Sequence, residues 1–187
     1  SKRLDKGAVI FNTEREEGFA VFVVDNTNRT EARYWIDDFL RVRQRQDNYH
    51  NTHNTLAMCK KYVTKHLSKE FEVSKADQAE LLNETMKYFQ EQESFSMDDF
   101  SEKVIRQPEV VESFTRFRQE YEQDRDIRIE DEFGISDSAV KKQARSYKSV
   151  IKLDRNFHIY VHGNRNLLEQ GEDEKGKFYK VYYEEEE

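Results

Sequence analysis

Patterns typical of β-strands mark the two ends of the chain, and helical repeats fill the middle. Near the N-terminus, a polar loop separates the apolar runs 7–11 and 19–24, which predicts a β-hairpin. The run 19–24 is almost wholly apolar and is therefore expected to be an interior strand buried on both faces. Near the C-terminus, residues 147–153, 157–162 and 178–183 alternate with a period of two, as half-buried strands do. We expect these three segments to form an antiparallel three-stranded meander.

Two connections join the strands of this meander. The first, residues 153–156, is short and rich in turn residues, so the first two strands are expected to form a hairpin. The second connection runs from His162 to Gly176 and is expected to contain one turn of helix at residues 165–170.

Between the terminal strands, apolar residues recur every three or four positions, which is the spacing of the buried face of an amphipathic helix. About six helices are expected, over residues 30–45, 54–68, 74–92 and 96–107, from 108 onward, and from 136 onward. Three of them carry inner stripes: Leu56, Cys59, Val63 and Leu67; Ala79, Leu82, Met86 and Phe89; and Val110, Phe114, Phe117 and Tyr121. These stripes predict the buried side of each helix.

Local signals indicate where two of these helices begin. Ser96 followed by Asp99 has the spacing of a capping box, and Phe95 with Phe100 forms a hydrophobic-staple pattern across the same start. Pro108 disfavours helical geometry in the residue before it and suits the first turn of a new helix. We therefore expect one helix to end just before Pro108 and another to begin there.

This order, with strands at both ends and helices between them, predicts an α+β fold. We expect a single α+β domain over residues 1–187, with the terminal strands sharing one sheet. The alternative is a separate helical subdomain over residues 71–135. The chain lacks an initiator methionine and begins almost directly with a strand, so we expect it to be the C-terminal part of a longer protein.

Composition adds that the chain is folded and strongly charged. Charged residues make up 37% and the mean hydropathy is -1.03, as in disordered chains, but aromatic residues make up 13%, which argues against disorder. The net charge of -7 is unevenly distributed. Residues 71–135 carry 18 Asp and Glu against 8 Lys and Arg, whereas residues 136–170 carry 7 Lys and Arg against 3 Asp and Glu. Local potential governs contact with a polyanion, so the segment 136–170 is compatible with one.

The sequence offers little support for catalysis, a metal or a membrane. Cys59 is the single cysteine, which excludes an intrachain disulfide and a cysteine-built zinc site. His50 and His53 lack ligand partners at a recognisable spacing, and the acidic run 130–132 does not converge on one point. No phosphate-binding glycine loop, nucleophile elbow, apolar membrane span or signal peptide appears. We expect a cytoplasmic, non-enzymatic protein without a metal or cofactor.

The open face of the C-terminal meander is the main candidate for a binding surface. Cations interleaved with an aromatic ring can neutralise phosphates and stack on a base. The side chains of this face are Lys148, Lys152, His158, Tyr160 and His162, with Arg155 and Arg165 in the connections at its edges. An amphipathic sheet with a solvated outer face explains the same pattern without a ligand. A further alternative is a protein-interaction or oligomerisation module whose aromatic faces pair with another subunit.

Several short stretches of the chain have a distinctive amino-acid sequence. They are LDKGAVIFN at residues 4–12, VVDNTN at 23–28, EARYWIDDFL at 31–40, AVKKQAR at 139–145, and LDRNFHIYVHG at 153–163, followed by NRNLLEQG and FYKVYY. Together they resemble the C-terminal half of the bacterial 37-kDa nucleoid-associated protein family, in particular its Bacteroidetes branch. The resemblance spans essentially the whole chain. It implies a protein of the bacterial nucleoid that binds DNA and has no enzymatic activity.

From these observations together, we predict binding of double-stranded DNA through backbone phosphates, with weak sequence preference. The predicted contacts are Lys141, Lys142, Arg145, Lys148, Lys152, Arg155, His158, His162 and Arg165, with a second basic group of Arg41, Arg43, Arg45, Lys60, Lys61 and Lys65. If His158 and His162 take part, binding tightens as the pH falls below about 6.5, because only a protonated imidazole adds charge. The alternative is an interaction or homo-oligomerisation module of a nucleoid protein whose DNA contacts lie in its N-terminal half.

Overall fold

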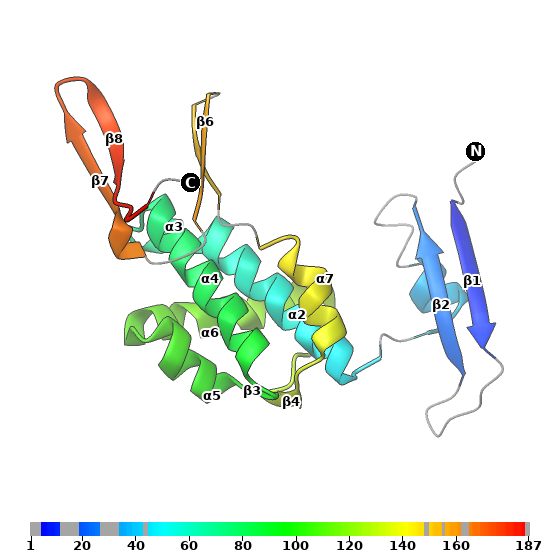
Figure 1. The fold of residues 1–187 in the computed structure, drawn as a ribbon. Helices are drawn as coiled ribbons and strands as arrows, with labels where there is room; N and C mark the ends of the chain where they lie inside the picture. The colour runs from blue at the N-terminus through cyan, green and yellow to red at the C-terminus, as the bar shows by residue number, and fades with distance from the viewer. Residues whose placement is uncertain are drawn as a thin grey trace. The chain divides into compact units, whose positions relative to one another are not determined.

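The computed structural model describes residues 5–11, 19–26, 34–42, 45–147, 150–154, 156–161 and 165–185. The chain divides into two compact units, residues 1–45 and 46–187. Figure 1 shows a hairpin and a short helical turn in the first unit, and a helical body with two further hairpins in the second. The order of strands and helices makes the fold α+β, as predicted.

The first unit contains the predicted N-terminal hairpin. Strand β1 (Lys6–Phe11) pairs antiparallel with β2 (Ala20–Asp25), with Val9 opposite Phe22. The hairpin prediction is confirmed, but the expectation that 19–24 is an interior strand is wrong. The sheet has two strands among the described residues, and Phe22 is 67% exposed. A continuous apolar run indicates a strand but not how many neighbours cover it.

A π-helical turn, η1 (Tyr34–Phe39), lies where a helix reaching residue 45 was expected. The amide of Leu40 donates to the carbonyl of Trp35, five residues back, at 3.0 Å. Arg41 then has a φ of 52°, which lies outside the helical region. The helix therefore ends before Arg41, whereas it was expected to continue to residue 45. Its expected first turn lies outside the described residues.

Helices form the body of the second unit. They are α2 (Asn48–Lys61), η2 (Tyr62–His66), α3 (Leu67–Glu70), α4 (Lys75–Glu91), α5 (Met97–Phe100), η3 (Ser101–Ile105), α6 (Pro108–Arg125) and α7 (Asp137–Ala144). The first three follow one another without a break, so the helix expected over 54–68 is longer at both ends. Helices α2, α4 and α7 pack against one another and lie side by side in Figure 1. Within the described parts of the chain, no helix combines the length and apolar character that crossing a membrane requires.

Side-chain capping explains where α4 begins but not where α5 begins. The Ser74 hydroxyl accepts from the Asp77 amide at 3.1 Å, and the Asp77 carboxylate accepts from the Ser74 amide at 2.9 Å, which forms a capping box. The box expected between Ser96 and Asp99 is not formed. The Asp99 carboxylate instead accepts from the Tyr88 hydroxyl at 2.8 Å, because α4 and α5 pack closely enough to offer a tertiary partner.

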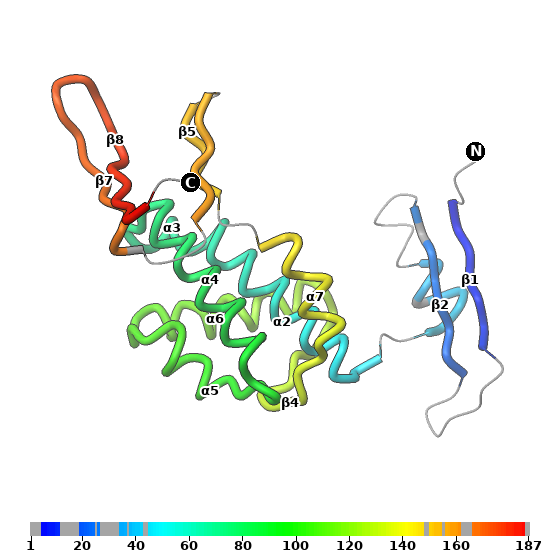
Figure 2. The backbone as a smooth tube through the Cα atoms, viewed as in Figure 1, coloured from blue at the N-terminus to red at the C-terminus, as the bar shows by residue number. Residues whose placement is uncertain are grey.

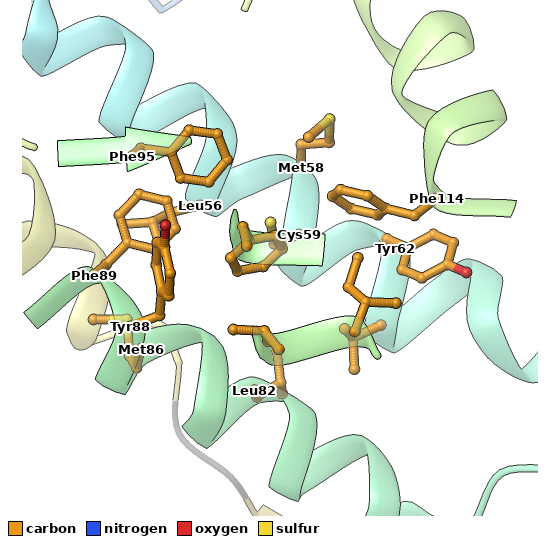
Figure 3. Close-up of a cluster of buried hydrophobic side chains, with 14 of the residues drawn as sticks. Leu56, Met58, Cys59, Tyr62, Leu82, Met86, Tyr88, Phe89, Phe95 and Phe114 are labelled. Atoms are coloured by element: carbon orange, nitrogen blue, oxygen red, sulfur yellow. The ribbon is translucent and has the colours of Figure 1, made fainter. Parts of the chain in front are cut away.

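An aromatic-rich core lies inside the helical body (Figure 3). All twelve residues of the three predicted helical stripes are buried, so those faces are confirmed. The rings of Phe95 and Phe100 lie 5.6 Å apart, which confirms the staple, and Pro108 is the first residue of α6. Cys59 is 2% exposed, and its burial raises the pKa of the thiol.

Two short strands close the core and were not predicted. Strand β3 (Ser94–Ser96) pairs antiparallel with β4 (Glu132–Gly134). Phe95 lies opposite Phe133, and their rings stack with centroids 4.8 Å apart. A strand of three residues is too short for its alternation to stand out from the flanking pattern.

A buried hydroxyl ties α2 to the start of α7. Thr52 is 0% exposed, and its hydroxyl donates to the Asn48 carbonyl at 2.6 Å and accepts from the Ser136 amide at 3.0 Å. Thr52→Val keeps the shape but leaves the Ser136 amide without its acceptor, so we expect the free energy of unfolding to fall by about 1–3 kcal/mol. Urea denaturation followed by circular dichroism measures this change.

The control for that substitution is Thr115→Val. Thr115 also donates to the carbonyl four residues back, at 2.9 Å, but it is exposed and accepts no tertiary bond among the described residues. We expect the control to change the free energy of unfolding by less than about 0.5 kcal/mol. Equal losses in both variants would mean that the contact with Ser136 does not stabilise the fold.

The C-terminal region forms two separate hairpins rather than the predicted three-stranded meander. Strand β5 (Val150–Leu153) pairs with β6 (Phe157–Tyr160), and β7 (Leu168–Asp173) pairs with β8 (Gly176–Val181). Figure 2 traces them as two distinct loops of chain. The first predicted hairpin is confirmed. Every sheet of the described residues has two strands, so the expectations of a meander and of one sheet shared by the terminal strands are wrong.

Strand β7 occupies most of the connection that was expected to hold a turn of helix. The helical part is limited to the 3-10 turn η4 (Arg165–Leu167), and β7 begins at the next residue. The side chains of β7 after Leu168 are mostly polar or charged, so apolar alternation does not reveal the strand. Cross-strand contacts support the pairing instead, since the Lys180 ammonium donates to the Glu169 carboxylate at 3.1 Å.

Candidate nucleic-acid interface

The outer face of the β5–β6 hairpin carries the expected mixture of cations and an aromatic ring. Lys152 lies opposite His158, and Tyr160 lies two residues further along β6, so the three side chains share one face. All three are exposed, Tyr160 by 57%. Ile151 and Ile159, also opposite each other, belong to the other face. The alternation therefore predicted the sides of the hairpin correctly, and the role of its outer face stays a prediction.

The inner face of this hairpin rests on α4. Ile151 and Val161 are 1% and 8% exposed and pack with Ala76 and Ala79 in the first half of α4. The side-chain amide of Asn83 donates to the carbonyl of Val161 at 3.1 Å. Small alanine side chains let the hairpin approach the helix closely. These contacts leave the face that carries Lys152 open to solvent.

The C-terminal end of α7 holds three more of the predicted cations. Lys141 and Lys142 lie in its last turn, and Arg145 follows directly. A helix C-terminus has partial negative charge, so cations are favourable there. All three side chains are exposed, and the Lys142 ammonium also donates to the Tyr49 hydroxyl at 3.2 Å. Tyr147, which is 4% exposed, anchors the chain before it continues to β5.

The second predicted basic group is divided between the two units. Arg41 and Arg45 belong to the first unit, whereas the lysines of α2 and η2 belong to the second, so the group is not one cluster within a unit. The lysines are Lys60, which is half-buried, and Lys61 and Lys65, which are exposed. The Lys61 ammonium lies 5.3 Å from the centroid of the Tyr121 ring, a cation–π contact on α6.

The side chains of five predicted contact residues lie outside what the structure describes. Arg43, Lys148, Arg155 and His162 lie outside the described part of the chain. Arg165 lies in η4, where the backbone alone is described. The predicted contacts that the second unit positions are therefore Lys141, Lys142, Arg145, Lys152 and His158, with the three lysines of α2 and η2.

Four residues beside these cations were not predicted as part of a binding site. The Tyr49 ring stacks on the His53 ring, with centroids 6.3 Å apart and planes 16° apart. The Arg125 guanidinium carbon lies 4.6 Å from the centroid of the Tyr121 ring. Each pair has the i, i+4 spacing at which helical side chains meet, and that spacing is the signal by which the sequence could have revealed them.

The residues that were considered as metal ligands from the sequence form other contacts in the structure. The His50 Nδ1 donates to the Asp47 carboxylate, 2.7 Å away, at the start of α2. Asp131, in the acidic run 130–132, pairs with Arg118 at 2.5 Å. Among the residues that the structure describes, no three histidine, cysteine or carboxylate side chains are grouped as metal ligands would be.

An acidic groove lies on the part of the second unit away from the hairpins. It runs between α5, η3 and α6, and the acidic side chains along it are Asp98, Glu102, Glu112, Asp131 and Glu132. Figure 1 shows α5 and α6 at the bottom of the helical body and the two C-terminal hairpins at the top. The uneven charge of the sequence is thus also uneven in space. This arrangement keeps the acidic groove away from a polyanion that approaches the outer face of β5–β6.

In a comparison with known protein families, the model described as nucleoid-associated protein YejK matches residues 1–186. No curated protein and no solved structure matches the chain.

Proposed function

The chain belongs to the nucleoid-associated protein YejK family, and on that basis we propose that it binds double-stranded DNA in the bacterial nucleoid. In this proposal the contacts are mainly to backbone phosphates, with weak sequence preference and no catalytic step. Lysine and arginine gain affinity for DNA by releasing the counterions that surround phosphates, and this gain does not depend on sequence.

The outer face of β5–β6 is the observation that supports this proposal most. Lys152 and His158 stand beside Tyr160 on an exposed face, and α4 holds the hairpin so that this face stays open. The cationic end of α7 precedes it along the chain. The proposed contacts are those predicted from the sequence: Lys141, Lys142, Arg145, Lys148, Lys152, Arg155, His158, His162 and Arg165, and separately Arg41, Arg43, Arg45, Lys60, Lys61 and Lys65.

A salt titration of binding to random-sequence duplex DNA tests the proposal. The test variant changes Lys141, Lys142, Lys148 and Lys152 to glutamine. We expect log K to fall steeply with log salt for the native chain, and the slope to become shallower by about 0.9 for each lost phosphate contact, about 3.6 in all. Fluorescence anisotropy at several salt concentrations gives both slopes.

A matched variant controls for the loss of four positive charges. It changes Lys69, Lys87, Lys175 and Lys177 to glutamine, because these lysines are exposed and lie on other surfaces of the second unit. We expect the control to keep the native slope to within about one unit. If the salt slope became shallower by the same amount in both variants, DNA would be attracted by the total positive charge of the chain rather than by a defined binding surface.

The second candidate function is that of an interaction or homo-oligomerisation module. The exposed apolar side chains of the first unit favour it: Val9, Ile10 and Phe22 are 59%, 65% and 67% exposed. Apolar surface gathered on one hairpin is typical of a contact with another chain. Absence of DNA binding at low salt from a folded sample, together with a mass above that of the monomer in sedimentation, would favour this function over the first.

A further inference from the structure

Three helices of the second unit bring basic side chains together. Helix α2 contributes His53 and Lys61, the last residue of α6 contributes Arg125, and the last turn of α7 contributes Lys142. We call these four residues the α2–α6–α7 cluster. Two of its members, His53 and Arg125, were not among the predicted contacts, whereas Lys61 and Lys142 were.

Aromatic rings connect the members of the cluster. The Lys142 ammonium lies 5.9 Å from the centroid of the Tyr49 ring, which stacks on His53. At the other end, the Lys61 ammonium and the Arg125 guanidinium lie 5.3 Å and 4.6 Å from the centroid of the Tyr121 ring. The rings hold the long cationic side chains in place, so less conformational entropy is lost when a ligand binds.

The cluster holds its charges without carboxylate partners. No ion pair between described residues includes Lys61, Arg125 or Lys142. His50, another histidine of α2, donates to the Asp47 carboxylate at 2.7 Å. Like charges that are held together without counter-charges favour an anion at that place.

We propose that the α2–α6–α7 cluster binds a backbone phosphate of nucleic acid and that His53 takes up a proton when it does so. This inference rests on the proposed function and adds two contact residues, His53 and Arg125, and regulation of binding by pH. The bound species is a phosphate monoanion of the DNA chain. It lies between Lys142 and Arg125, with the protonated imidazole of His53 as a further donor.

The surroundings of His53 determine in which direction its pKa changes when a phosphate binds. Burial lowers its pKa, and the positive charges of Lys142 on α7, His50 on α2 and Arg125 on α6 lower it further, against a hydrogen bond with Asn54 that raises it. These influences favour the neutral imidazole in the free protein. A phosphate offsets the repulsion and favours the charged form, so the pKa rises on binding.

The expected pH dependence follows from linkage between binding and protonation. Between the pKa of His53 in the complex and its lower pKa in the free protein, DNA affinity rises as the pH falls. Above both pKa values, His53 contributes no pH dependence. One unit of difference between the two pKa values corresponds to about a tenfold gain in affinity across the window.

The direct test follows the imidazole resonances of the full chain by NMR between pH 5 and 8.5, with and without duplex DNA. We expect the pKa of His53 to rise by about one unit with DNA. Arg125→Gln should raise the pKa of His53 in the free protein, because one repelling charge is gone. His53→Gln should flatten the dependence of log K on pH relative to the native chain.

Each outcome separates the inference from the function on which it rests. DNA binding with an unchanged pKa of His53 overturns the inference and keeps the proposed function. No DNA binding at low salt overturns both. Inorganic phosphate in millimolar amounts is the third arm of the test. If it raises the pKa of His53 as much as DNA does, the site takes a free phosphate and its assignment to nucleic acid is wrong.

Discussion

Replacing Phe114 with alanine is expected to lower the free energy of unfolding of the second unit by about 3–5 kcal/mol. Phe114 is 1% exposed, and its ring centroid lies 5.1 Å from that of Tyr62 and 6.0 Å from that of Phe100. Truncation removes the transfer free energy of the ring and leaves a cavity between α2, α5 and α6. Because helices on several sides meet at this ring, the walls can close the cavity only in part.

The control is Phe157→Ala, which removes the same ring from an exposed position. Phe157 is 65% exposed on β6, so its truncation should change the free energy of unfolding by less than about 0.5 kcal/mol. Urea unfolding followed by far-ultraviolet circular dichroism measures both variants. A loss below about 1 kcal/mol for Phe114→Ala would show that the aromatic core is less tightly packed than described.

Ile151→Asp is expected to detach the β5–β6 hairpin from α4. Ile151 is 1% exposed and packs with Ala76 and Ala79. A carboxylate there has no partner, and an uncompensated buried charge costs about 3–5 kcal/mol. The hairpin forms few other contacts with the helical body, so it should open locally while the helices stay folded.

Hydrogen exchange distinguishes this local opening from global unfolding. We expect the backbone amides of β6 to lose protection in Ile151→Asp while those of α2 and α4 keep it. Lys152→Asp is the matched control, since the same carboxylate then stands on the exposed face and the hairpin should stay attached. Full protection of β6 in Ile151→Asp would mean that the contacts with α4 do not anchor the hairpin.

The helical faces were predictable because each depends on local sequence. The stripe that contains Phe114 recurs at the helical period, and Pro108 marks the start of its helix, so neither needed knowledge of distant residues. The same holds for the sides of β5–β6, which follow from alternation alone. Capping at Ser96 failed because Tyr88, a residue from another helix, competes for Asp99.

The pairing of the C-terminal strands was not predictable from apolar alternation. The segment 178–183 was expected beside β6, but β8 pairs with β7 across the tight turn before Gly176, whose φ is 120°. Closing a short loop loses less chain entropy than closing a long one, so the local partner is favoured. Strand β7 was not predicted because its charged side chains, such as Glu169 and Glu172, interrupt the apolar alternation that indicates a strand.

The candidate site was likewise predictable only within single elements. Lys152 and His158 were assigned to one face from their positions in adjacent strands. His53 and Arg125 lie far apart in the sequence and on different helices, so only tertiary packing brings their charges near Lys142. The i, i+4 spacing relates each of them only to an aromatic ring in its own helix.

The burial of Cys59 makes the single thiol of the chain a reporter of core opening. A thiol-specific reagent attacks the thiolate, and burial both shields the sulfur and suppresses that form. In the folded protein the reagent should therefore react only during excursions that lift α2 from its neighbours. Labelling rates under native conditions then measure the free energy of those excursions, without any engineered probe. Since the chain has one site, the kinetics are those of a single position.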